Sequence, residues 1–200
     1  MRFRALFLAV LVLSLAAAGC ASTHVVHEWR NPELATLPRF KKIMVFEVNQ
    51  QPGIRRSFED QFVLRLKAAG VDAVPSYRFI TEDGPVEEQR RREAFAQAGA
   101  DATLVTRLVR VQQMYPVSPY YYYPPAPRFY RGPWYGYYGP PAYPYEVYVS
   151  ETSLYDTARN ELVWSGTVEA SPTEVSEDIA RYVNVVIEAL QKQNLLAAAR

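Results

Sequence analysis

The sequence predicts an α/β fold, in which one mixed sheet of five strands carries its helices mainly on one face. Three observations support this fold class. Short apolar runs alternate with stretches of helical period in the first half of the chain, which is typical of parallel strands joined by right-handed crossovers. Two later runs alternate between apolar and polar residues, which indicates a sheet with one solvated face. A last amphipathic stretch completes the order β-α-β-α-β-β-β-α.

The first strand, helix and second strand follow one another closely. Lys41–Val48 contains a continuous apolar run, which fits a strand covered on both faces. A turn at 50–53 precedes residues that place one apolar stripe at helical period, and Gly70 supplies the stop. Val71–Val74 is then the second strand, and Pro75 ends it.

The second helix is predicted to open at Asp83-Gly84-Pro85 and to end at Gly99. It contains the run Arg90-Arg91-Arg92, which neighbouring glutamates neutralise at helical spacings. We interpret the run as a solvated, ion-paired helix face. Thr103–Val111 is rich in β-branched residues and is the third strand.

The second half supplies two strands and a helix. Tyr145–Tyr155 and Glu161–Ala170 alternate, and the loop between them predicts a hairpin. Ser171-Pro172-Thr173-Glu174 has the form of a capping box with proline at the first helical position. We expect the helix that follows to bury one apolar stripe and to complete a single domain over residues 39–196.

The first nineteen residues are predicted to be an export signal. Arg2 and Arg4 precede an apolar run over 5–18, and small residues lead to Cys20. Ala17-Ala18-Gly19-Cys20 resembles the lipobox of bacterial lipoproteins, although that family usually has leucine where Ala17 stands. The resemblance implies cleavage after residue 19, lipidation of Cys20 and a place on the periplasmic face of the outer membrane. The alternative is a secreted protein cut near Ala18, with Cys20 a free thiol.

The mature chain is predicted to begin with a lipidated tether over residues 20–38, because prolines there leave no sustained period. Losing residues 1–19 removes two of the 22 basic residues and leaves 20 against 21 acidic ones. Such a balance offers no basic excess for nucleic acid. Cys20 is the sole cysteine, so the chain has no internal disulfide.

Residues 115–145 form a Tyr/Pro-rich insertion between the third and fourth strands. They hold eleven of the fifteen tyrosines and nine of the fifteen prolines, a composition that excludes helix and central strand. Tyrosine offers large contact area at low entropic cost, which suits contact with another envelope protein, cell-wall glycan or lipid headgroups. The alternative is a low-complexity insertion without a partner. The expected contact residues are Tyr120, Tyr121, Tyr122, Tyr123, Tyr130, Trp134, Tyr137 and Tyr138.

No pattern in the chain brings together residues that could catalyse a reaction or bind a cofactor. His24 and His27 form an H-x-x-H without a third ligand nearby, which favours tether residues over a zinc site. The turn after the first strand lacks the glycines and lysine of a phosphate loop. We therefore expect a non-enzymatic binding or accessory protein without a cofactor. The alternatives are a structural subunit of an envelope assembly and, less favoured, a wall hydrolase.

Several short motifs of the mature chain resemble an uncharacterised family of bacterial envelope lipoproteins. The order of elements is also similar to the α/β domains of the curli-secretion lipoprotein and of penicillin-binding-protein activator lipoproteins, which implies partner binding or oligomerisation. The motifs that carry the family resemblance are Trp29-Arg30-Asn31-Pro32, Phe40-Lys41-Lys42-Ile43, Arg55-Arg56-Ser57-Phe58-Glu59-Asp60, Gly70–Tyr77, Gly99–Leu108, and Leu154-Tyr155-Asp156 with Leu162–Gly166.

Overall fold

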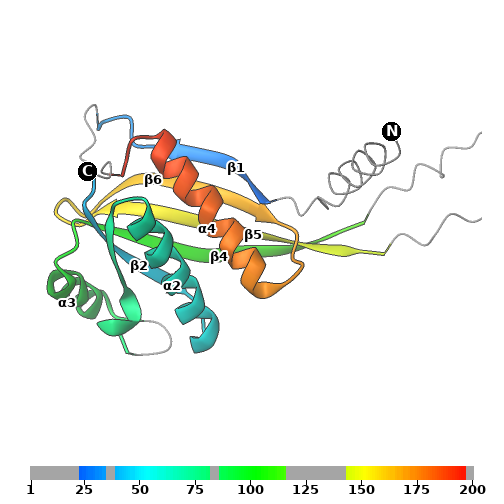
Figure 1. Cartoon of the computed structure of the whole chain (residues 1–200), viewed down its shortest axis with the longest axis horizontal. Helices are drawn as coiled ribbons and strands as arrows, with labels where there is room; N and C mark the ends of the chain where they lie inside the picture. Colours follow the sequence, from blue (N-terminus) through cyan, green and yellow to red (C-terminus); the bar gives the residue numbers. More distant parts are fainter. Residues whose placement is uncertain (1–22, 35–38, 82–85, 116–142, 197–200) are drawn as a thin grey trace, which may run out of the picture.

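A computed structural model describes residues 23–34, 39–81, 86–115 and 143–196 of the chain. In these residues a single six-stranded sheet has the order β1-β6-β5-β4-β2-β3 (Figure 1). The mixed α/β fold is confirmed. The elements are β1 (Thr23–Arg30), β2 (Lys42–Val48), α2 (Pro52–Ala68), β3 (Asp72–Pro75), the 3₁₀ turn η1 (Ser76–Arg78), α3 (Glu88–Ala98), β4 (Ala102–Met114), β5 (Tyr145–Asp156), β6 (Glu161–Ala170) and α4 (Val175–Lys192).

The sheet joins a parallel half to an antiparallel half, as the sequence predicted. β2 pairs in parallel with both β3 and β4, through the crossovers that contain α2 and α3. β4, β5 and β6 pair antiparallel in chain order. The hairpin between β5 and β6 contains Asn160 at φ +53°, in the left-handed region that asparagine tolerates.

The strand count of five was wrong, because Thr23–Arg30 is a sixth strand in a segment that we expected to be tether. β1 pairs antiparallel with β6 at the edge of the sheet. Most of its side chains are exposed, so the segment has no apolar alternation to reveal it. Its backbone supplies the pairing, and Asn31 continues it by donating its backbone N–H to the carbonyl of Val163 (3.0 Å).

Helices cover the two faces of the sheet unequally. α2 and α4 pack over one face and enclose the main core, whose largest buried side chains include Phe62, Trp164 and Leu190. α3 lies on the opposite face and contributes Ala94 and Ala98 to a smaller cluster. β2 lies between the main core and this smaller cluster, so both of its faces are covered, which explains its continuous apolar run. The expectation of helices mainly on one face therefore agrees with two of the three described α-helices.

The helix ends differ from the predicted ones. Gly70 (φ +86°) and Gly99 (φ +58°) adopt the left-handed conformation after α2 and α3, as expected of helix stops. The predicted capping box at 171–174 is wrong, since the N-cap of α4 is Glu174. Its carboxylate accepts hydrogen bonds from the side chain of Ser176 and from two backbone N–H groups, and these bonds lower the pKa of Glu174. No helix among the described residues is both long and apolar enough to span a bilayer.

Candidate functional site

The sheet narrows at one end into an arm, which comprises Leu108–Met114 of β4 and Tyr145–Ser150 of β5, beyond the end of β2. β2 pairs with β4 only as far as Arg107, and β6 pairs with β5 only from Tyr148 onward. The outer part of the arm, Gln112–Met114 with Tyr145–Val147, therefore protrudes beyond the other strands (Figure 1). Met114 pairs with Tyr145 at its end, so the chain leaves the arm and returns to it at one place.

The arm exposes large apolar and aromatic side chains, most of them on β4 and where the two strands end. Monomeric domains rarely leave such side chains grouped in water, and grouped exposure marks contact surfaces. Arg107 and Glu151 pair at the base of the arm, at 3.4 Å between Nη2 and Oε2. The exposed residues on or next to the arm are Leu108, Val109, Val111, Met114, Tyr115, Tyr143 and Tyr145.

Strand β1 begins at the same end of the sheet from which the arm protrudes. Thr23 pairs with Ala170, Ala170 with Tyr148, and Tyr148 with Val111, so these four residues form one row across four strands. From this row, β1 runs back into the sheet while the arm runs outward (Figure 1). The start of β1 and the arm therefore lie at the same end of the sheet.

The predicted site residues lie outside the described residues. This holds for the lipidation site Cys20 and for the contact residues Tyr120, Tyr121, Tyr122, Tyr123, Tyr130, Trp134, Tyr137 and Tyr138. The structure describes both ends of the Tyr/Pro-rich insertion, at Tyr115 and from Tyr143 to Tyr145, and brings them together at the end of the arm.

The two histidines lie in strand β1 rather than in a tether. His24 pairs with Glu169 and His27 with Thr167, on either side of a bulge in the strand. Both side chains are exposed. Within the described ranges, no three histidine, cysteine, aspartate or glutamate side chains gather in a way that could hold a metal ion.

A buried polar row crosses the face of the sheet beneath α4, and sequence reasoning missed it. Glu47 of β2, Thr106 of β4 and Thr152 of β5 are register partners and are all nearly inaccessible. The Thr106 and Thr152 hydroxyl oxygens lie 2.8 Å apart, and the Tyr182 hydroxyl lies 2.7 Å from that of Thr152. Glu47 Oε2 has no hydrogen-bond partner among the described residues. Burial, reinforced by the negative charge of Glu59, raises the pKa of Glu47 to about 8.

Glu59 anchors a second buried cluster next to this row. Its Oε1 accepts from Arg55 Nε (3.1 Å) and from Ser76 Oγ (2.6 Å), and its Oε2 accepts from the Tyr77 backbone N–H (3.1 Å). Arg55 also donates to the carbonyl of Ile80 (3.3 Å). The cluster ties η1 to α2 and satisfies a fully buried carboxylate, so we assign it a structural role. The i, i+4 spacing of Arg55 and Glu59 is the sequence signal that could have indicated it.

The arginine run of α3 is ion-paired only in part. Arg92 pairs with Glu88, four residues earlier, as predicted. Arg91 instead donates from Nη1 to the carbonyl of Val86 (2.7 Å). No carboxylate in the described part of the chain pairs with Arg91, so the predicted ion pairing of this helix face does not extend to this residue.

Comparison with known proteins identifies a family. No curated protein matches the chain. Similar solved structures include the PelC dodecamer from Paraburkholderia phytofirmans, with 15% identity over 82% of this chain and 97% of that one, at a TM-score of 0.45. Lipoprotein GNA1162 from Neisseria meningitidis has 13% identity over 76% of this chain and 98% of that one, at 0.42. Residues 68–193 match the family described as a domain of unknown function, DUF4136, and the chain belongs to that family.

Proposed function

We propose that this chain is a non-enzymatic accessory protein of the bacterial envelope that contacts its partner through the β4–β5 arm. The partner would be another envelope protein or a cell-wall glycan. The observation that carries the proposal is the arm itself. It exposes an apolar surface on strands that project beyond the core, and it presents the Tyr/Pro-rich insertion at its end. Aromatic and apolar side chains on a rigid support are typical of contact surfaces.

The proposal includes a lipid anchor on Cys20 at the periplasmic face of the outer membrane. The pairing of Thr23 with Ala170 supports it, because this register puts the start of β1 at the arm's end of the sheet. Three residue steps separate Cys20 from Thr23, a reach of about 10 Å at most. An anchor there would hold the domain close to the membrane and the arm close to its surface.

The test is in-cell crosslinking with mass spectrometry on the full-length protein and two variants. In the first variant, Asn-Gly replaces residues 115–144, which closes the hairpin after Met114. The second keeps the length of the insertion but replaces its eight predicted contact residues with serine. We expect specific envelope partners with the wild type and their loss in both variants. Both variants keep the strands of the arm. Loss in the closed variant alone would assign contact to other residues of the insertion, and partners that persist in both variants would contradict a contact surface at the end of the arm.

A second candidate function is a structural subunit of an oligomeric assembly. The edge of β4 beyond Arg107 favours it, since β2 ends at that register and no other described strand pairs with this edge. Free backbone groups on an apolar edge can pair with a second copy. Light scattering on the purified full-length protein separates the candidates, because a monomer at micromolar concentration excludes a stable ring.

A further inference from the structure

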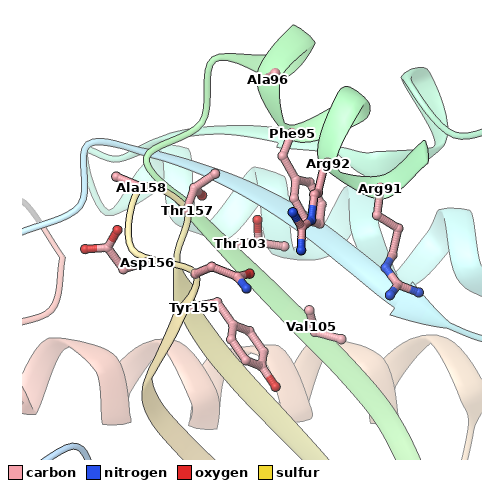
Figure 2. Close-up of a pocket in the computed structure, with 11 residues that line it drawn as sticks. Arg91, Arg92, Phe95, Ala96, Thr103, Val105, Tyr155, Asp156, Thr157 and Ala158 are labelled. Atoms are coloured by element: carbon pink, nitrogen blue, oxygen red, sulfur yellow. The ribbon is translucent and has the colours of Figure 1, made fainter. Parts of the chain in front are cut away.

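A pocket of about 610 Å³ lies between α3 and the open face of the sheet (Figure 2). Thr103 and Val105 of β4 and Tyr155 of β5 form its floor. The wall is one side of α3, and the loop between β5 and β6 closes one end. This volume is in the range of pockets that hold small organic ligands. The wall and loop residues are Arg91, Arg92, Phe95, Ala96, Thr157, Ala158 and Asn160.

Two hydroxyl groups in this pocket have no partner within the described protein. Thr103 is 2% exposed, and its Oγ1 makes no hydrogen bond. Thr157 Oγ1 is also buried without a partner. Buried hydroxyls are nearly always hydrogen-bonded in folded proteins, because leaving one unpaired costs free energy. Both unpaired hydroxyls belong to residues that line the pocket, so a polar ligand that reaches them would satisfy them.

The charge of the pocket is positive. Figure 2 shows Arg91 and Arg92 extending from α3 toward the strands of the floor. Arg92 pairs with Glu88, whereas Arg91 donates only to a backbone carbonyl among the described residues. The one acidic lining residue, Asp156, turns its carboxylate away from both arginines (Figure 2) and accepts the Arg159 backbone N–H (3.0 Å). No acid of the pocket therefore pairs with either arginine, and no carboxylate among the described residues neutralises Arg91.

We propose that this pocket binds a small organic anion, whose carboxylate or phosphate group is held by Arg91 and Arg92. Planar guanidinium groups bind either oxyanion with two parallel hydrogen bonds. The Thr103 hydroxyl donates to the same ligand, and the apolar part of the ligand packs on Phe95 and Val105. This site is separate from the arm, because its floor residues 103, 105 and 155 lie toward the opposite end of the β4–β5 pair.

Calorimetric titration of the full-length protein in non-ionic detergent tests the proposal with three probes. Phenyl phosphate and benzoate carry the two oxyanions on the same ring, and benzyl alcohol is the neutral comparison. We expect at least one anion to bind about tenfold more tightly than the alcohol. The preferred anion distinguishes a phosphate ligand from a carboxylate ligand. Anions that bind no better than benzyl alcohol would overturn the proposal.

Three variants separate recognition by these residues from general charge and from folding. R91Q/R92Q is expected to lose about tenfold in affinity for the preferred anion and to keep that for benzyl alcohol. R65Q/K67Q removes the same charge from exposed positions of α2 and should bind as the wild type does. T103V should raise the Tm, since it removes an unpaired buried hydroxyl, and should weaken anion binding several-fold. Unchanged binding in R91Q/R92Q, or a T103V that alters the Tm alone, would contradict the assigned roles.

Discussion

Glu47 is a buried carboxyl without an ion pair among the described residues, and its neighbours determine its protonation. The nearby Glu59 carboxylate already accepts hydrogen bonds from Arg55 and Ser76, so a second negative charge beside it is disfavoured. Tyr182, on the other side of the row, is also buried, and burial raises the pKa of its hydroxyl. Both neighbours therefore favour the protonated, neutral form of Glu47.

The substitution Glu47→Gln should remove a pH dependence of stability. The pKa of Glu47 is raised from 4.5 to about 8 in the folded protein, so folding favours the protonated form. The stability from this proton is full below pH 4.5 and is lost as the pH rises through 8. Relative to wild type, the variant should gain about 4 kcal/mol in free energy of unfolding between pH 5 and pH 9. Urea unfolding at pH 5, 7 and 9 measures it.

The matched control is Glu161→Gln, which changes an exposed glutamate at the start of β6. Its stability should follow the wild-type curve at every pH. If Glu47→Gln follows that curve as well, Glu47 is ionised in the folded protein and the buried row contains a negative charge.

Trp164 and Gly166 depend on each other. They lie two residues apart on β6, and a Cβ on Gly166 would come within 2.6 Å of the Trp164 ring atom Cζ2. Gly166→Ala should therefore cost about 1–3 kcal/mol, because Trp164 is fully buried and cannot move away. Trp164→Phe removes that ring, so adding Gly166→Ala to it should cost much less. Chemical denaturation of the four proteins completes the double-mutant cycle, and additive costs would show that the ring does not limit residue 166.

At the scale of elements, the sequence was most informative where burial imposes a period. β2 is covered on both faces and β6 on one, and their patterns predicted their bounds to within one residue. β1 was missed because an edge strand needs only backbone pairing, and its exposed side chains follow no period. The cap of α4 was misplaced because Ser171 and Glu174 fit a capping box in sequence, whereas Glu174 itself caps the helix.

Both ends of the insertion meet at the end of the arm, so we expect the sheet to fold without the insertion. Closing the hairpin tests this. With Asn-Gly in place of residues 115–144, a loop of 30 residues becomes one of two. Shorter loops lose less entropy on closure, so the free energy of unfolding should rise by about 2 kcal/mol. Thermal melts followed by circular dichroism measure it. A Gly/Ser linker of the original length should melt as the wild type does, and a closed variant that fails to fold would show that the insertion supports the sheet.

At the scale of the whole molecule, the candidate pocket was not predictable from the chain. Its residues come from α3, from two strands and from a loop, and they are brought together by the register of β4 with β5. In sequence, Arg91 and Arg92 belong to a run with adjacent glutamates, which favours a solvated face. Only the packing of α3 over the sheet places them beside Thr103 and Tyr155. The arm was predictable in part, since the insertion interrupts two strands that the sequence identified.

β1 begins at the end of the sheet where the arm lies, and this predicts which part of the protein faces a membrane. The backbone of Cys20 can lie no farther than about 10 Å from that of Thr23. The arm continues three residues past the row that contains Thr23 and Val111, which is about 10 Å. The hairpin loop between β5 and β6 lies about 27 Å from that row in the other direction, eight residues along β5.

Fluorescent labels at Y115C and at R159C, in lipidated protein on vesicles with quencher headgroups, test this orientation. Tyr115 is 69% exposed at the end of the arm, and Arg159 is 52% exposed in the opposite loop. The label at 115 should be quenched strongly and the label at 159 weakly. Equal quenching would mean that the domain has no fixed orientation on the membrane. Adding Cys20→Ser should abolish quenching at both positions, since the anchor brings the arm to the surface. Quenching that persists at 115 alone would show that the arm itself binds lipid.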